Sequence, residues 1–309
     1  MRLSRMLALG ASALLLVGAC AAGGGSSSST RPTLKIGSDG FYESELMAQI
    51  YGQAAEAQGF PVDFNGLAMG ARAVTTPALL SGKIDMKPEY IGSGLSYFEK
   101  GKATGDPAAN EAALQAVLKT QGGGITVLNY TPAQDQNAFV VRQATATQYN
   151  LTTMSQLAPI QNQLKWGLAT DCPTNPVCGA ALKSAYGISP TNVTYLDACS
   201  TPMAQALAAK TIDVGELCST QPDIVVDGFV VLQDDKQTQP ADNIAPLVRD
   251  SYLNKLSSAD RQLFDKTLND VSAKMTTTML TELGKQIAVD HQDIAAVAKS
   301  WLTQEGLLK

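Results

Sequence analysis

Apolar and polar positions follow two alternating periods along most of the chain. Residues 33–38, TLKIGS, form a short β-rich run, whereas residues 44–59 place apolar side chains at helical spacing. The same order of strand, loop and helix recurs in PVDFNGL, ARAVTTPALLSG and IDMKPEY. Strands that alternate with helices predict an α/β fold whose strands are joined by parallel crossovers.

The pattern is interrupted near residue 135 and then begins again. Extended runs at residues 125–130 and 137–142 are joined by a polar crossing, and a second series of strands and helices follows. Residues 229–233, FVVLQ, are predicted to be the strand that returns to the first unit. We therefore expect two lobes with the following boundaries: lobe I from residues 33–134 plus 230–309, and lobe II from residues 135–229.

An internal similarity suggests that the lobes are distant copies. ALLSGKIDM at residues 78–86 resembles ALAAKTIDV at residues 206–214, and each is a helix end followed by a strand with an Ile-Asp pair. In open α/β sheets, ligands bind outside the carboxyl ends of the strands. The loops at residues 38–43 and 88–94 are therefore the first candidates for a binding site.

The first twenty residues have the organisation of a bacterial export signal. Two arginines precede an apolar run at residues 6–16, and Val-Gly-Ala stands directly before Cys20. This order predicts a lipoprotein signal peptide over residues 1–19 and a lipidated Cys20 that anchors the protein at the extracytoplasmic face of the cell membrane. Residues 20–32 are rich in Gly and Ser and predict a flexible linker. The alternative is a signal peptide that contains a cysteine by chance.

Charge and cysteine content narrow the class of protein. Lys and Arg number 23 against 28 Asp and Glu, which gives a net charge of −5 and argues against a nucleic-acid partner. Four further cysteines, an even number, suit an oxidising compartment. They allow three pairings, of which we favour Cys172 with Cys178 and Cys199 with Cys218. A zinc site is disfavoured by the spacing, so we expect no metal.

Motifs for catalysis or cofactor binding are not found in the sequence. The one histidine, His291, lies in a polar helical stretch, and no Gly-x-Ser-x-Gly elbow, phosphate loop or dinucleotide motif follows a strand. We interpret His291 as a solvated surface residue and expect neither an enzyme nor a cofactor. An extracytoplasmic hydrolase or sensor module stays as the alternative from another class.

Aromatic residues are concentrated in the candidate loops. Phe41 and Tyr42 occupy the first loop and Tyr90 the second, where their faces could bind a cation. Tyr97 and Phe98 follow Leu95 at helical spacing and are interpreted as core.

Two sequence blocks stand out, GSDGFYE at residues 37–43 and GKIDMKPEYIGS at residues 82–93. They resemble the opening motif and the more specific second motif of the glycine betaine/choline-binding proteins of osmoprotectant ABC importers. DQNAFVVR, DCPTNPVC, GFVVLQDDK and QPADNIAPLVR are similar to segments of actinobacterial members. The resemblance covers nearly the whole chain after the linker.

The resemblance implies a two-lobed type II periplasmic-binding-protein fold that closes on a small solute and then docks on the permease subunits of an ABC transporter. We expect a monomer. An aromatic cage is also implied, with Tyr90 on a cage tyrosine and Ser93 beside it. The predicted ligand-binding residues are Ser38, Asp39, Phe41, Tyr42, Tyr90, Ser93, Gln136 and Asn137 from the first lobe and hinge, and Asp197 and Ser200 from the second lobe.

Departures from the family's pattern bear on the ligand. Many relatives have a basic residue where Asp39 stands, and an arginine that can bind the carboxylate of betaine aligns with Asn175. Both differences favour a cationic ligand without an anionic group, which makes choline preferred over glycine betaine. A neutral aromatic compound or a polyamine is the alternative within the same fold.

Overall fold

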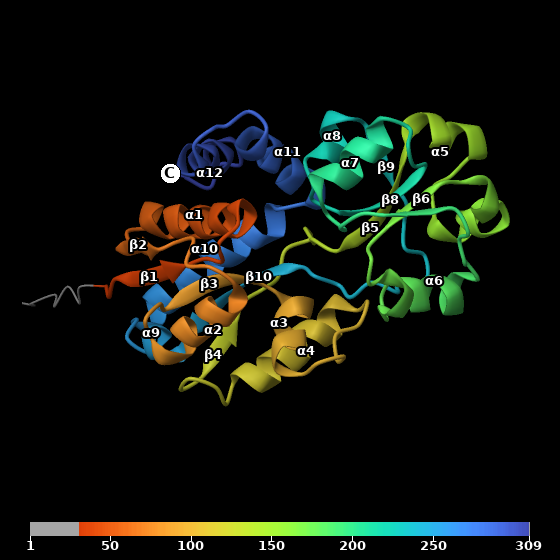
Figure 1. The fold of residues 1–309 in the computed structure, drawn as a ribbon. Coiled ribbons are helices and arrows are strands. Elements are labelled where there is room, and N and C mark those ends of the chain that lie inside the picture. Colours follow the sequence, from red (N-terminus) through yellow and green to blue (C-terminus); the bar gives the residue numbers. More distant parts are fainter. Residues whose placement is uncertain (1–30, 309) are drawn as a thin grey trace, which may run out of the picture. The chain divides into compact units, whose positions relative to one another are not determined.

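Two five-stranded mixed sheets form the framework of the computed structural model, which describes residues 31–308 (Figure 1). Each sheet contains parallel strands and one long antiparallel strand. The first sheet has the order β2 (Val62–Gly66), β1 (Leu34–Gly37), β3 (Met86–Tyr90), β10 (Ile244–Arg249) and β4 (Ile125–Val127). The second has the order β7 (Val193–Tyr195), β6 (Trp166–Leu168), β8 (Val214–Cys218), β5 (Asn137–Arg142) and β9 (Phe229–Val231). The predicted two-lobed α/β fold is thereby confirmed.

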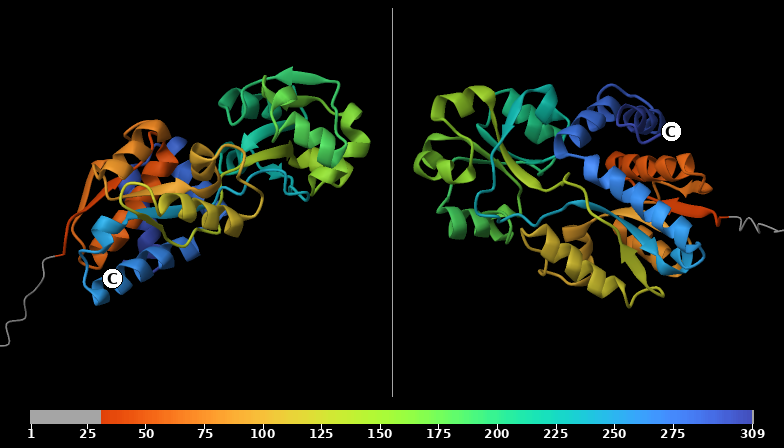
Figure 2. Two further views of the ribbon diagram at one scale, coloured as in Figure 1. Left: turned by 90° about the horizontal axis from the view of Figure 1, so that it is seen from below. Right: turned by 180° about the vertical axis from the view of Figure 1, so that it is seen from behind.

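Helices pack on both faces of each sheet (Figures 1 and 2). Those of the first lobe are α1 (Tyr42–Ala57), α2 (Arg72–Ser81), α3 (Ile91–Phe98), α4 (Pro107–Leu118), α9 (Asp250–Leu253), α10 (Ser258–Lys274), α11 (Thr277–Ala288) and α12 (Ile294–Gln304). Those of the second are α5 (Gln143–Tyr149), the 3-10 helices η1 (Met154–Gln163) and η2 (Cys172–Thr174), α6 (Gly179–Tyr186), α7 (Thr201–Ala208) and α8 (Asp223–Val226). Within residues 31–308 no helix has both the length and the apolarity to cross a bilayer.

The chain crosses between the lobes twice, and the two crossings are hydrogen-bonded to each other. Gln134 and Asn243 form an isolated antiparallel bridge, and the amide of Asp135 donates to the carbonyl of Asp242 at 3.1 Å. The predicted end of lobe II at residue 229 is wrong by a few residues, because β9 pairs with β5 in the second sheet. A third link is made by α11, which packs against α8.

The internal similarity corresponds to the same local structure in both lobes. Asp85 and Asp213 each stand just before a central strand, β3 or β8. The amide of Asp85 donates to the carbonyl of Lys35, and its carboxylate accepts from the amide of the same residue, at 2.7 and 3.1 Å. Asp213 makes the same two bonds with Lys165, at 2.7 and 3.0 Å. Each aspartate therefore fixes a parallel pair of strands in register.

The predicted disulfides are both present, Cys172–Cys178 and Cys199–Cys218. The signal peptide over residues 1–19 and the lipidated Cys20 lie outside the described residues. Arg31, at the end of the predicted linker, packs on the folded first lobe and is not part of a flexible segment. Its guanidinium pairs with Asp260 at 2.7 Å and lies 4.3 Å from the ring centre of Phe60, so the folded lobe begins by residue 31.

A buried lysine organises the site end of the first lobe. Lys87 has no exposed side-chain surface, and its Nζ lies 2.9 Å from Asp39 Oδ1 and 3.0 Å from Glu89 Oε2. Thr75 Oγ1 accepts a third bond at 2.9 Å, and its hydroxyl donates to Asp39. These bonds use all three Lys87 donors, which is the condition for a buried charge to be tolerated.

Replacement of this lysine by methionine is expected to destabilise the protein severely. Lys87→Met would leave Asp39 and Glu89 buried without their shared cation, which should lower the free energy of unfolding by about 3–5 kcal/mol. Urea unfolding followed by circular dichroism measures the change. Lys266→Ala is the control, because its pair with Asp270 is exposed and should contribute less than about 0.5 kcal/mol. Equal losses in the two variants would contradict the role given to Lys87.

Candidate functional site

The first chamber is a cavity of about 560 Å³ lined by both lobes and both crossings. Aromatic side chains from the first lobe, Phe41, Tyr90 and Tyr97, form part of its wall, and Asp135 and Asp242 come from the crossings. Val177 and Cys218 face them from the second lobe. The chamber is therefore an inter-lobe cleft with an apolar side and an acidic side.

A second chamber of about 640 Å³ adjoins the first at Phe41, Asp135 and Cys218, which line both. It lies between the start of α1, the loop that joins α11 to α12, and the starts of α7 and α8. Its other lining residues include Tyr42, Glu43, Thr220, Gln221, Asp223 and His291.

The end of β3 and the start of α1 bring the ring of Tyr90 and the carboxyl group of Glu43 together. Tyr90 is the last residue of β3, and its hydroxyl donates to Glu43 Oε1 at 2.5 Å. The ring of Phe41 lies 5.9 Å from that of Tyr90, at an angle of 33°. This places two aromatic faces and a carboxyl group at the junction of the two chambers.

The pKa of Glu43 is raised to about 8, first by burial and second by the nearby charge of Asp135. The pKa of Asp135 is itself raised, chiefly by burial, although hydrogen bonding from Thr220 opposes the shift. The carboxylate Oδ1 of Asp135 is buried and accepts no hydrogen bond. A buried carboxylate oxygen without a hydrogen-bond partner favours a positively charged ligand.

Asp242 lines the first chamber from the second crossing and is held by Ser93, in the first turn of α3. The amide of Ser93 donates to Asp242 Oδ1 at 2.8 Å, and its hydroxyl donates to Oδ2. Gly92 permits this approach, because a Cβ at that position would lie 2.6 Å from the carbonyl of Ala241. Burial raises the pKa of Asp242 to about 6, against the lowering effect of the Ser93 bonds.

Positive charge at the site is already paired. Arg72 is the one lysine or arginine among the described residues that line the first chamber, and it binds Glu89 through two nitrogens at 3.1 and 3.0 Å. The described lining of the second chamber contains neither residue type. The site therefore offers carboxylates to a ligand but no free guanidinium or ammonium group.

Six of the ten predicted ligand-binding residues line the chambers. Five of them line the first chamber: Phe41, Tyr90, Ser93, Gln136 and Asn137. Tyr42 lines the second chamber, which Phe41 lines as well.

Four predicted residues line neither chamber. Ser38 and Asp39 are buried below the cleft, where Ser38 Oγ accepts from the amide of Ala68 and Asp39 binds Lys87. Ser200 caps α7, and its hydroxyl donates to the carbonyl of Asp197. The inference from Asp39 about ligand charge is wrong, because its charge is neutralised inside the lobe.

The structure also adds residues to the site. Tyr97, interpreted from the sequence as core, is 44 % exposed and lines the first chamber, since α3 turns that side outward. Glu43, Asp135 and Asp242 were not predicted as ligand contacts, although Glu43 stands in the opening motif and could have been selected there. Asn175 bonds within its own loop, where its Oδ1 accepts from the amide of Val177 at 3.0 Å.

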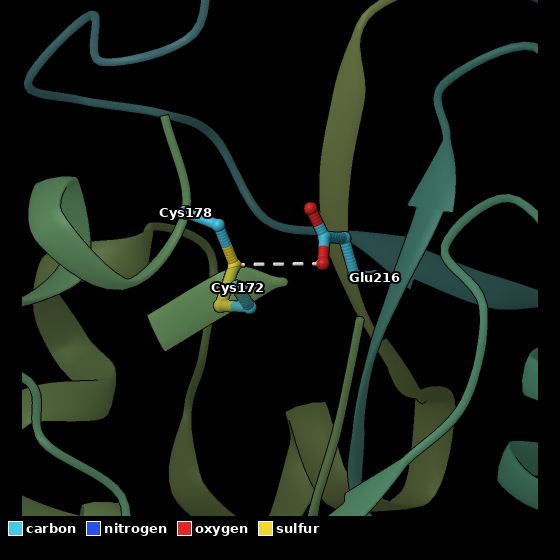
Figure 3. Close-up of side chains that lie close together, drawn as sticks. All are labelled: Cys172, Cys178 and Glu216. Atoms are coloured by element: carbon cyan, nitrogen blue, oxygen red, sulfur yellow. Dashed lines mark hydrogen bonds between the residues drawn. A yellow bond between two sulfur atoms is a disulfide. The ribbon is translucent and has the colours of Figure 1, made fainter. Parts of the chain in front are cut away.

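A separate cluster lies inside the second lobe (Figure 3). Glu216 is 1 % exposed, and its Oε2 lies 3.5 Å from the sulfur of Cys178, which is bonded to Cys172. Cystine sulfurs lack the thiolate charge that binds metal ions. With the disulfide formed, the cluster is therefore a buried cystine that packs beside the carboxyl group of Glu216. Burial raises the pKa of this carboxyl group.

Two α/β lobes, hydrogen-bonded crossings and a cleft lined from both sides define the class of two-lobed periplasmic binding proteins. Residues 32–304 match the family described as the substrate binding domain of the ABC-type glycine betaine transport system, and the chain belongs to this family. Its members are solute-binding proteins of ABC transporters, not enzymes.

Individual relatives agree with this assignment. The chain is 28 % identical over 288 residues to the glycine betaine-binding protein YehZ of Escherichia coli strain K12, which covers 89 % of this chain and 92 % of the relative. It is 26 % identical over 280 residues to the carnitine transport binding protein OpuCC of Listeria monocytogenes, covering 89 % and 87 %. The crystal structure of a glycine betaine/carnitine/choline ABC transporter superposes with a TM-score of 0.81 at 21 % identity, covering 89 % of this chain and 100 % of that one.

The buried carboxyl groups predict that stability without ligand falls as the pH rises. Glu43 binds its proton more tightly in the folded state, with a pKa near 8 against an ordinary value of 4.5, so its contribution is present below that ordinary value and is lost as the pH rises through 8. We expect wild type to melt at a lower temperature at about pH 8 than at about pH 5. Glu43→Gln, which keeps an acceptor for Tyr90, should show a smaller decrease.

Differential scanning fluorimetry at constant ionic strength measures the decrease in melting temperature between pH 5 and pH 8 for both proteins. Asp242 titrates in the same direction near pH 6 and remains in the variant, so the decrease should be reduced and not abolished. Equal decreases in the two proteins would contradict the raised pKa of Glu43.

Proposed function

We propose that this protein captures a quaternary-ammonium solute in the first chamber, with choline preferred over glycine betaine, and delivers it to the permease of an ABC importer. The observation that carries the proposal is the combination of aromatic faces with carboxylates, without an unpaired lysine or arginine in the described lining of the first chamber. Tyr90 and Phe41 offer their rings, and Asp135 offers a carboxylate without a lysine or arginine partner among the described residues. The charge of a trimethylammonium group is attracted to both features.

The same charges disfavour a ligand with its own carboxylate. Glycine betaine would bring an anionic group into a chamber that already contains Asp135 and Asp242, and Arg72 is bound to Glu89. Like charges in a partly desolvated site repel, and a buried carboxylate without a cationic partner is costly. Choline instead has a hydroxyl group, which can donate to an aspartate.

Magnitudes indicate that lobe closure is part of binding. Each aromatic face contributes about 0.5–2 kcal/mol to a desolvated cation, whereas a micromolar complex requires about 8 kcal/mol. Two or three rings are not sufficient by themselves. Closure about the two crossings would bring Val177 and Cys218 of the second lobe onto the ligand and exclude water from the carboxylates.

Isothermal titration with choline, glycine betaine and carnitine tests the proposal. Choline should bind at least about tenfold more tightly than glycine betaine, a difference of about 1.4 kcal/mol. The neutral carbon isostere of choline should bind weakly, because it lacks the charge. Tight betaine binding without heat from choline would overturn the preference.

Variants assign the effect to residues. Asp135→Asn keeps the shape of the side chain but removes its charge, and should weaken choline binding about tenfold. Tyr90→Leu keeps an apolar side chain but removes the ring face, and should weaken choline more than the neutral isostere. If both ligands weaken equally, the ring acts through contact area alone.

We also propose that the protein is a monomer held at the membrane by a lipid on Cys20. The support for the anchor is the sequence before Cys20, since residues 1–30 lie outside the described structure. A receptor tethered in this way meets its permease at a high effective concentration.

Metabolic labelling with alkyne-palmitate tests the anchor. Wild type should be labelled and recovered in the membrane fraction, whereas Cys20→Ala should be unlabelled. Cys199→Ser, which leaves the signal intact, is the control for cysteine loss. Equal labelling of Cys20→Ala and wild type would contradict the anchor.

A further inference from the structure

The second chamber has a lining that the capture of a quaternary ammonium group does not use. Three carboxyl groups line it, those of Glu43, Asp135 and Asp223, and no lysine or arginine is found among its described lining residues. Its hydroxyl groups, from Tyr42 and Thr220, can either donate or accept. The chamber is therefore rich in acceptors. Its negative charge at neutral pH comes from the aspartates, because a pKa of about 8 keeps Glu43 mostly protonated.

Two of its acceptors have no hydrogen-bond partner. Asp135 Oδ1 is buried and unpaired where the two chambers adjoin. Gln221 is 9 % exposed, and its Oε1 also accepts nothing. The orientation of this amide is fixed chemically, because its Nε2 donates to Asp223 Oδ2 at 2.8 Å. Buried acceptors normally have partners, so these two oxygens indicate a donor supplied from outside the chain.

A quaternary ammonium group cannot be that donor, since it has no N–H. A primary ammonium group has three donors and a positive charge, and both suit the chamber. Phe41 lies between the two chambers and lines each of them, so one ligand can pass its ring. The first chamber then holds the quaternary ammonium group, and the second chamber holds the primary ammonium group with its N–H donors.

We propose that the second chamber is a subsite for a primary ammonium group, so that the receptor binds extended dications more tightly than monocations of the same length. This inference rests on the proposed function, because it assumes that the first chamber holds the alkylated cation. The matching ligand class is a linear amine with two positively charged ends. The carboxylates of Asp135 and Asp223 neutralise the terminal charge, and Gln221 Oε1 and Asp135 Oδ1 accept hydrogen bonds from its N–H groups.

A matched pair of ligands isolates the terminal group. Aminopentyl-trimethylammonium and pentyltrimethylammonium have the same head and chain, and differ only in the ammonium group at the end. Isothermal titration at neutral pH should show at least a tenfold tighter complex for the amine with the wild-type protein. Propyl and butyl homologues then give the length that best spans the chambers.

Three variants test whether the gain arises in the second chamber. Gln221→Leu removes an unpaired acceptor, and Asp223→Asn removes a charge while keeping an oxygen for Gln221. Each should reduce the affinity ratio of the two ligands severalfold. Asp227→Asn is the control, because Asp227 is exposed at the end of α8 and lines neither chamber, so it should leave the ratio unchanged.

The outcomes separate this inference from the function on which it rests. If choline and pentyltrimethylammonium bind but the terminal amine gives no gain, the subsite is overturned and the proposed function stands. If neither monocation binds, the proposed function fails. A gain that survives both Gln221→Leu and Asp223→Asn would place the terminal ammonium elsewhere and overturn the subsite.

Discussion

The buried charge of Lys87 is the interaction on which the geometry of the site depends. Its ammonium group binds Asp39 after β1, Thr75 on α2 and Glu89 at the end of β3. Glu89 in turn accepts from the amide of Tyr90 at 2.9 Å. One buried cation therefore holds together β3, α2 and the loop after β1. This loop leads to Phe41 and to Glu43 at the start of α1. Removing the cation would displace the aromatic face as well as destabilise the lobe.

This arrangement also decides which charges reach a ligand. Asp39 and Glu89 are satisfied by Lys87 and Arg72 within the first lobe, so neither contributes to the cleft. Asp135 and Asp242 come from the crossings, and among residues 31–308 no basic residue forms an ion pair with Asp135. A negative cleft thus arises from the separation of paired and unpaired acids, and the net charge of the chain alone would not reveal it.

The sequence predicted the architecture well because periodicity and duplication are local signals. The repeated Ile-Asp pair identified two equivalent strands, and Asp85 and Asp213 indeed make the same bonds in the two lobes. Tyr90 was predicted for the site because it ends a parallel strand. Asp39 was assigned to the site for the same reason, but a side chain just after a strand can point into the core as well as into the cleft. The buried partner that decides its direction, Lys87, lies 48 residues away.

The acidic residues of the crossings were harder to predict, because they join the site only when both crossings run side by side. The two lobes, although similar around Asp85 and Asp213, present unequal walls. Tyr90 and Cys218 end the equivalent strands β3 and β8, and both line the first chamber. One lobe therefore presents an aromatic ring, and the other presents a disulfide that constrains the loop at Cys199. Cys199 has a φ of +54°, a conformation that is uncommon for a residue with a side chain, and its bond to Cys218 links this loop to the end of β8 beside the second chamber. An aromatic wall held by the Lys87 cluster and an opposite wall tied by a disulfide suit a cleft that closes on a cation, because each lobe can then move as a rigid body about the two crossings.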